Sequence, residues 1–251
     1  VTNNSTGVAG TASNAKVVPV RVLGKCGGYT SDIADAIVWA SGGTVSGVPA
    51  NANPAEVINM SLGGGGSCSA TYQNAINGAV GRGTTVVVAG GNESSNVSTS
   101  VPANCANVIA VAATTNTGAK ASFSNYGAGI DISAPGQAIL STLNTGTTVP
   151  ASATYASYNG TSMAAPHVGG VVALMQSVAP TALTPAQVET IIKNTARALP
   201  GACSGGCGAG IVNADAAVVA EQGGRGGNPD AGTGTVLQNN GGVGGRGDPS
   251  G

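Results

Sequence analysis

One serine lies where a loop passes into a run of small residues that can pack as a helix. This residue, Ser162, belongs to the segment of residues 159–170, NGTSMAAPHVGG. The N-terminus of a helix carries a partial positive charge, which favours an alkoxide nucleophile or the oxyanion that its attack generates. The same Gly-Thr-Ser sequence is equally consistent with an ordinary cap of a buried helix, so the segment alone leaves both interpretations open.

An asparagine, Asn92, follows the apolar run Val86–Ala89 after two glycines. Ligands of α/β enzymes bind at the carboxyl ends of strands, and a side-chain amide there can donate a hydrogen bond to a developing oxyanion. A turn is the other interpretation, because Gly-Asn sequences commonly form one.

A third segment, residues 59–66 (NMSLGGGG), ends in four glycines. Backbone without Cβ atoms can lie against an extended peptide or against a side chain that enters a pocket. Taken alone, the glycines indicate only a loop.

The elements that must position these residues alternate between strand and helix. Apolar, β-branched runs without polar interruptions are typical of parallel strands that are covered on both faces. Strands are expected at residues 15–23, 56–61, 84–89, 107–112, 129–133 and 138–142, a hairpin at 145–158, and helices at 32–40 (capped by Thr30 or Ser31), 69–81, 162–178 and 184–199. This alternation predicts right-handed crossovers and a three-layer α/β sandwich with a mostly parallel, twisted sheet.

Composition excludes several classes of protein. Nine Lys and Arg against ten Asp and Glu give a net charge of −1, which argues against a nucleic-acid-binding module. No apolar run approaches the ~20 residues that a membrane span needs. Residues 1–220 are predicted to form one domain, built from these alternating strands and helices. The glycine-rich residues 221–251 can bury too little apolar surface to offset the entropy of ordering, so they are predicted to be a disordered tail or linker.

Five cysteines and a low content of charged residues, 8%, suit a secreted protein, in which disulfides persist. The expected pairs are Cys68 with Cys105 and Cys203 with Cys207. Cys26 is left over. It is either a free, buried thiol or the partner of a cysteine outside this chain.

In this order, the three glycine-containing segments resemble the subtilisin-like serine proteases, the subtilases. Residues 160–170 match the family's signature around its nucleophile, Gly-Thr-Ser-Met-Ala-x-Pro-His-Val-x-Gly, at every defined position. The resemblance extends from about Gly7 to Val219. It implies a subtilisin-like fold, with Ser162 as the nucleophile and the Asn92 side chain as the oxyanion-hole donor.

The resemblance also implies which residues bind a protein or peptide substrate. Those that would line the primary specificity pocket are Ser61, Leu62, Gly63, Ala89, Gly90 and Gly91. The small residues favour a roomy, uncharged pocket for a large apolar side chain. Gly27 and Gly28 would lie in the strand that pairs with the substrate backbone by β-augmentation.

A subtilase also needs an aspartate and a general-base histidine. The one histidine of the chain is His167, which would be turned by about 140° and displaced by ~7.5 Å from Ser162 along one helix. The resemblance therefore implies a fragment, incomplete at its N-terminus, that begins just after the catalytic histidine and is inactive alone. Cys26 would then pair with a cysteine of the absent segment.

The resemblance further implies a structural calcium ion, bound where the carbonyls of Ala106 and Val108 meet the carboxylate of Asp131. A surface turn is the other interpretation of Asp131. No organic cofactor is expected.

Two rival functions were considered. An α/β-hydrolase needs a histidine far downstream of its serine, and no histidine follows residue 167. A non-catalytic binding or structural protein that keeps the subtilase fold is the alternative to a secreted serine endopeptidase, and the missing aspartate and histidine are the feature that favours it.

Overall fold

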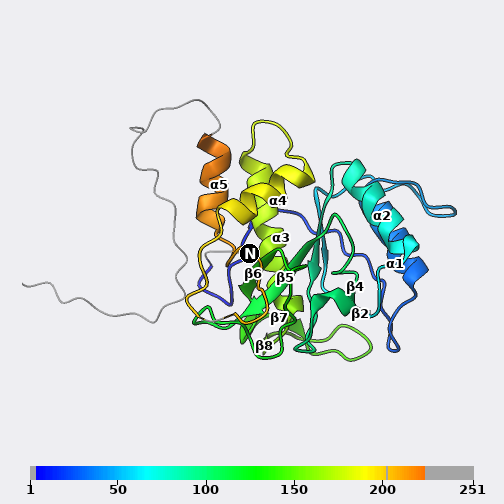
Figure 1. The fold of residues 1–251 in the computed structure, drawn as a ribbon. Coiled ribbons are helices and arrows are strands. Elements are labelled where there is room, and N and C mark those ends of the chain that lie inside the picture. Colours follow the sequence, from blue (N-terminus) through cyan, green and yellow to red (C-terminus); the bar gives the residue numbers. More distant parts are fainter. Residues whose placement is uncertain (1–3, 202, 224–251) are drawn as a thin grey trace, which may run out of the picture.

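A parallel sheet forms the centre of the protein in a computed structural model that describes residues 4–201 and 203–223 (Figure 1). The strands, in order across the sheet, are β1 (Val57–Met60), β3 (Thr85–Ala89), β5 (Ile109–Thr114) and β6 (Ile132–Pro135). All three neighbouring pairs are parallel. Every residue of β3 and β5 is buried, as their uninterrupted apolar sequences predict.

Helices cover both faces of this sheet (Figure 1). Val87 of β3 packs in a core with α3, whereas its neighbours Val86 and Val88 enter a second core on the opposite face. The first core is shared with α3 (Thr161–Val178), α4 (Pro185–Asn194) and α5 (Ala214–Gly223), and the second with α1 (Thr30–Ala40) and α2 (Ala70–Gly81). The expected three-layer α/β architecture is therefore confirmed.

Two predicted helix starts are found, and one predicted cap is wrong. Ser69 caps α2 by accepting a hydrogen bond from the backbone of Tyr72, and Thr184 forms a capping box with Gln187 at the start of α4. Helix α1 instead begins at Thr30, and its N-cap residue Tyr29 makes no side-chain hydrogen bond. Helix α4 ends at Asn194, earlier than predicted.

The predicted strand at residues 15–23 is not formed. These residues belong to no ladder, and Val17, Val18, Val20 and Leu23 are exposed. The segment has a strand-like sequence, but a strand requires a hydrogen-bonded neighbour, and no described strand pairs with it.

The strand predicted at residues 129–133 begins later, at Ile132. The predicted hairpin begins earlier than expected, because it consists of β7 (Ile139–Asn144) and β8 (Ala153–Tyr158), paired antiparallel outside the main sheet. A second small ribbon joins β2 (Gly64–Gly65) to β4 (Ser100–Val101), which follows the 3-10 turn η1 (Val97–Thr99).

Helix α5 was not foreseen from the sequence. The Asn213 side chain accepts a hydrogen bond from the backbone of Ala216, which is the signal that could have indicated the helix start. The helix extends to Gly223, three residues into the predicted tail, and the rest of that tail lies outside the described residues.

Both expected disulfides are present, Cys68–Cys105 and Cys203–Cys207. A loop as long as the one that Cys68–Cys105 closes corresponds to about 4 kcal/mol of stabilisation on the chain-entropy estimate. Cys26 has a free thiol, and it is exposed, so the prediction of a buried thiol is wrong.

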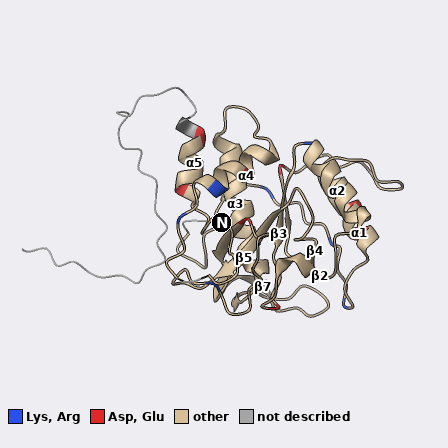
Figure 2. Ribbon diagram, viewed as in Figure 1, with Lys and Arg blue, Asp and Glu red and all other residues tan. Residues whose placement is uncertain are grey.

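Charged side chains are few and scattered over the ribbon (Figure 2). None of the described helices is both long and apolar enough to cross a membrane.

Candidate active site

Ser162 is the second residue of α3, at the end of the helix that lies beside the carboxyl end of β1. Its Oγ donates a hydrogen bond to the carbonyl oxygen of Ser61 at 3.3 Å, and the Ser61 hydroxyl donates to the carbonyl oxygen of Ser162 at 2.8 Å. The Ser61 hydroxyl in turn accepts from Nδ2 of Asn59 at 3.0 Å. This reciprocal pair fixes the start of α3 against the segment that follows β1.

The carbonyl oxygen of the Asn92 side chain is held by Thr161. Asn92 Oδ1 accepts from the backbone N–H of Thr161 at 2.8 Å and from its hydroxyl at 3.0 Å. The Thr161 hydroxyl also accepts from the backbone N–H of Gly91 at 3.0 Å. Because the oxygen is engaged, the amide nitrogen of Asn92 faces away from Thr161, and it donates to no acceptor within the described residues.

Asn92 and Ser162 border one cavity of about 230 Å³. Four of the six residues expected in the specificity pocket line it, namely Leu62, Gly63, Ala89 and Gly91. The other two, Ser61 and Gly90, do not line it: Ser61 contacts Ser162, as described above, and a Cβ at Gly90 would meet the carbonyl oxygen of Val111 at 2.9 Å.

Gly27 and Gly28 do not reach this cavity. They line a separate hollow of about 420 Å³ together with Cys26, Arg21 and Asp32. The structure therefore brings Ser162, Asn92 and most of the predicted pocket together at one cavity, but it places the two glycines apart from them.

Two residues of the site were missed in the sequence. Thr161 is fully buried and orients Asn92. Glu93 lines the cavity, and its Oε2 accepts from the backbone N–H of Asn92 and from Nδ2 of Asn125, both at 2.8 Å. Each is the immediate neighbour of a predicted residue, which is the signal that could have found it. Glu93 also means that the cavity is not lined by uncharged residues alone.

His167 takes no part in the site. Its Nδ1 lies 2.8 Å from the carbonyl oxygen of Met163, one turn earlier in α3. Within the described residues, the carbonyl oxygen of Ser61 is the hydrogen-bond partner of the Ser162 hydroxyl, and no imidazole or carboxylate bonds to it.

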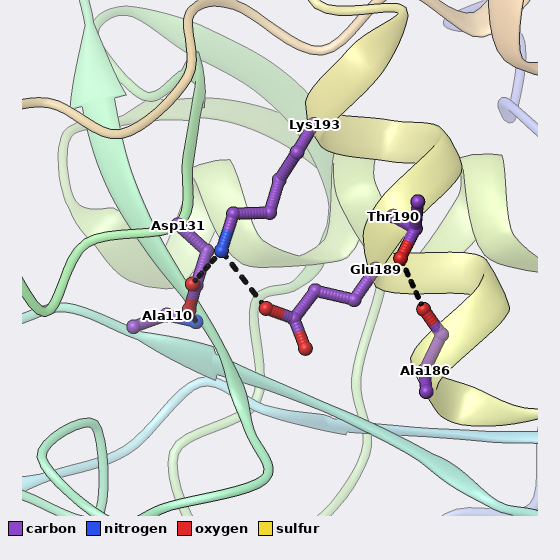
Figure 3. Close-up of polar contacts among 6 residues, drawn as sticks. All are labelled: Ala110, Asp131, Ala186, Glu189, Thr190 and Lys193. Atoms are coloured by element: carbon purple, nitrogen blue, oxygen red, sulfur yellow. Dashed lines mark hydrogen bonds and ion pairs between the residues drawn. The ribbon is translucent and has the colours of Figure 1, made fainter.

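The residues expected to bind calcium do not fit that ion. Asp131 Oδ1 accepts from the ammonium of Lys193 and Oδ2 accepts from the backbone N–H of Ala110, both at 2.8 Å (Figure 3). The carbonyl oxygen of Ala106 accepts from the Gln73 side chain. In the part of the chain that the structure describes, no three His, Cys, Asp or Glu side chains gather as a metal site.

The ammonium of Lys193 is bound by two carboxylates, because Oε1 of Glu189 also lies 2.8 Å from it. These hydrogen bonds, first to Asp131 and then to Glu189, raise the pKa of Lys193 to about 12. The amine is therefore a cation over the whole physiological pH range.

The covered parallel sheet and the serine–asparagine pair at the carboxyl ends of its strands are features of the subtilisin-like serine endopeptidases. A family model described as the subtilase family matches residues 1–210, so the chain belongs to that family.

Individual relatives and solved structures agree with this assignment. The chain is 85% identical over 220 residues to an extracellular protease of Xanthomonas campestris pv. campestris, covering 88% of this chain and 38% of that protein. It is 51% identical over 221 residues to an extracellular basic protease of Dichelobacter nodosus, covering 87% and 37%. A solved protease of Pseudoalteromonas arctica is 56% identical with a TM-score of 0.85, over 87% of this chain and 67% of that one. The chain thus spans less than two-fifths of the two curated relatives.

Proposed function

We propose that this chain carries the nucleophile and the oxyanion hole of a secreted serine endopeptidase. The observation that carries the proposal is that the Ser162 hydroxyl and the free amide of Asn92 border the same cavity. Secretion is supported by the names of the two curated relatives, both extracellular proteases.

In the proposed reaction, Ser162 Oγ gives its proton to the general base supplied from outside this chain and attacks the carbonyl carbon of a peptide bond. The C–N bond then breaks, the amine leaves with that proton, and water hydrolyses the remaining acyl-enzyme to release the acid and regenerate Ser162. The negative charge that develops on the substrate oxygen is stabilised by the Asn92 amide. The backbone N–H of Ser162 lies in the first turn of α3, where no carbonyl four residues earlier in the helix accepts it, so it is the second donor. Thr161 holds the Asn92 oxygen and thereby turns the amide toward the substrate.

The general base is the missing part of this mechanism. The one histidine of the chain is bound within α3, so the proton of Ser162 has no acceptor base here. We assign the base and its aspartate to polypeptide outside the 251 residues. This polypeptide would pair with the outer edge of β1 and cover the exposed segment of residues 15–23, and it would form a disulfide with Cys26, whose thiol is free and exposed.

The cavity is proposed to take the substrate side chain that precedes the cleaved bond. Leu62, Ala89 and Val101 give it apolar walls, so a large apolar side chain is the expected preference. The carboxylate of Glu93 is bound by two N–H donors, which leaves its charge partly neutralised. Gly27, which forms a β-bridge with Gly24, and its neighbour Gly28 are proposed to pair with the substrate backbone. This pairing would require the external polypeptide to cover the segment of residues 15–23 first.

A complementation assay tests the proposal. The 251-residue chain should hydrolyse no peptide above background, and it should gain activity when mixed with the N-terminal part of the Xanthomonas relative's catalytic domain. Ser162→Ala should abolish the gain, whereas Ser177→Ala, at an exposed position of the same helix, should leave it unchanged. Hydrolysis by the isolated chain that Ser162→Ala removes would contradict the external base, and restored activity that survives Ser162→Ala would contradict the nucleophile.

The second candidate is a non-catalytic protein that retains the fold, and the single, engaged histidine is the observation that favours it. A peptidyl phosphonate with an apolar side chain discriminates the two. After complementation, an enzyme is labelled covalently at Ser162, and a binding protein retains the peptide without a covalent adduct.

A further inference from the structure

We infer that the ammonium of Lys193 takes the place between Asp131 and Glu189 that a divalent cation could otherwise occupy, so that this part of the chain is cross-linked without calcium. The inference rests on the bonds around Asp131 and does not depend on any catalytic residue.

The carboxylate of Asp131 is positioned by the sheet and not by the lysine. The backbone N–H of Asp131 donates to the carbonyl oxygen of Ala110, and the backbone N–H of Ala110 returns a bond to Oδ2. The carbonyl oxygen of Asp131 accepts from Ala209. These backbone bonds remain when Lys193 is replaced, so the carboxylate stays in place.

Lys193 brings a cation to this fixed carboxylate from the neighbouring layer. It lies in the last turn of α4, whose Val188 and Ile192 are fully buried in the core below. Glu189, one turn earlier, supplies a second carboxylate to the same ammonium, while Thr190 beside it bonds back to its own helix (Figure 3).

The ammonium therefore connects α4 to β5 and to the start of β6, which is the kind of connection that a bound calcium ion provides. Calcium prefers oxygen ligands, and two carboxylates already converge here. The Lys193 ammonium lies 2.8 Å from Oδ1 of Asp131. A calcium ion bound to that oxygen would therefore lie next to a positive charge. The lysine thus excludes the ion from the carboxylates that would attract it.

The inference predicts that removal of the ammonium creates a calcium site. The backbone amide of Ala110 reports on it, since it bonds directly to Asp131, and its nuclear magnetic resonance signal can be followed during titration with CaCl2. In the unaltered 251-residue chain, this signal should not move up to 10⁻² M calcium. In Lys193→Met it should shift with half-saturation on the order of 10⁻⁴–10⁻³ M, the range of weak extracellular sites.

Three further variants make the test specific. Adding Asp131→Asn to Lys193→Met should remove the gained shift, and Lys193→Arg, which keeps a cation, should not gain one. Lys16→Met, at an exposed position, is the matched control without effect. The melting temperature of Lys193→Met should fall by a few degrees, and calcium should restore part of the loss.

Two results would overturn the inference. One is a saturable shift of the Ala110 amide signal when calcium is added to the unaltered chain. This measurement does not depend on the folding of any variant. The other is a folded Lys193→Met that binds no calcium, because the ammonium would then replace nothing.

Discussion

Two regions built from the same residue types differ completely in their surroundings. Val87, in the centre of β3, is fully buried in the core that the sheet shares with α3, whereas Val17, in a segment with an equally strand-like sequence, is 86% exposed. β1 lies between these extremes, because β3 pairs with one of its edges and no described strand pairs with the other. The comparison shows that strand-like sequence supplies the capacity to pair, and that a neighbour decides whether the strand forms.

The largest expected effect concerns the well-packed region, where Asn92 is held by Thr161. In the complemented enzyme, Asn92→Ala should lower kcat by about 10²–10³-fold with a small change in KM, the magnitude known from subtilisin itself when one oxyanion-hole donor is removed. Steady-state kinetics on a peptide substrate measures the effect. An equal loss through KM would instead mean that Asn92 binds the ground state.

The next effect compares the two valines directly. Val87→Ala should destabilise the fold by about 2–3 kcal/mol, because the buried side chain leaves a cavity. Val17→Ala should leave the free energy of unfolding of the isolated chain unchanged within error. Urea denaturation of both variants provides the measurement, and equal losses would show that the segment of residues 15–23 is packed in solution.

Hydrogen exchange sharpens the same comparison along the backbone. Amides of β3 should be strongly protected, and those of residues 15–23 should exchange close to the rate of an unstructured peptide. Addition of the complementing N-terminal polypeptide should slow residues 15–23 by at least about tenfold. Unchanged exchange in an active complex would contradict the proposed pairing.

The smallest effect belongs to Tyr72, whose phenol is buried between α1 and α2 and whose pKa is raised by this burial. The folded state then binds the phenolic proton more tightly than the unfolded state. Its contribution to stability is present below pH 10 and is lost as the pH rises above that value. Absorbance titration at 295 nm should show a phenol ionisation shifted above pH 10, and Tyr72→Phe should remove that step.

Local patterns predicted much of the fold and of the site. The uninterrupted apolar sequence of β3, the starts of α2 and α4, and the segment around Ser162 each contain their own signal within a few residues. Asn92 and Ser162 border one cavity in the structure, and their joint catalytic role is an expectation that comes from the family resemblance. The strand, the helix starts and the segment around Ser162 could be predicted because adjacent residues determine them.

The remaining features depend on partners that are distant in the sequence. The pairing of Lys193 with Asp131 joins residues 62 positions apart, and no local pattern distinguishes a carboxylate bound to an ammonium from one bound to calcium. The segment of residues 15–23 fails as a strand for the same reason, since its partner is not among the described strands.

The open edge of β1 has a consequence for how the chain behaves at high concentration. A strand edge that no described strand pairs with is a template for any other strand, including the same strand of a second molecule. The exposed side chains of Val17, Val18 and Val20 add apolar surface that favours association. Neither lysine nor proline interrupts residues 57–60 to discourage such contacts. Precipitation of the chain should therefore compete with complementation. The order of mixing should decide the outcome: adding dilute chain to an excess of the complementing N-terminal polypeptide should favour the complex.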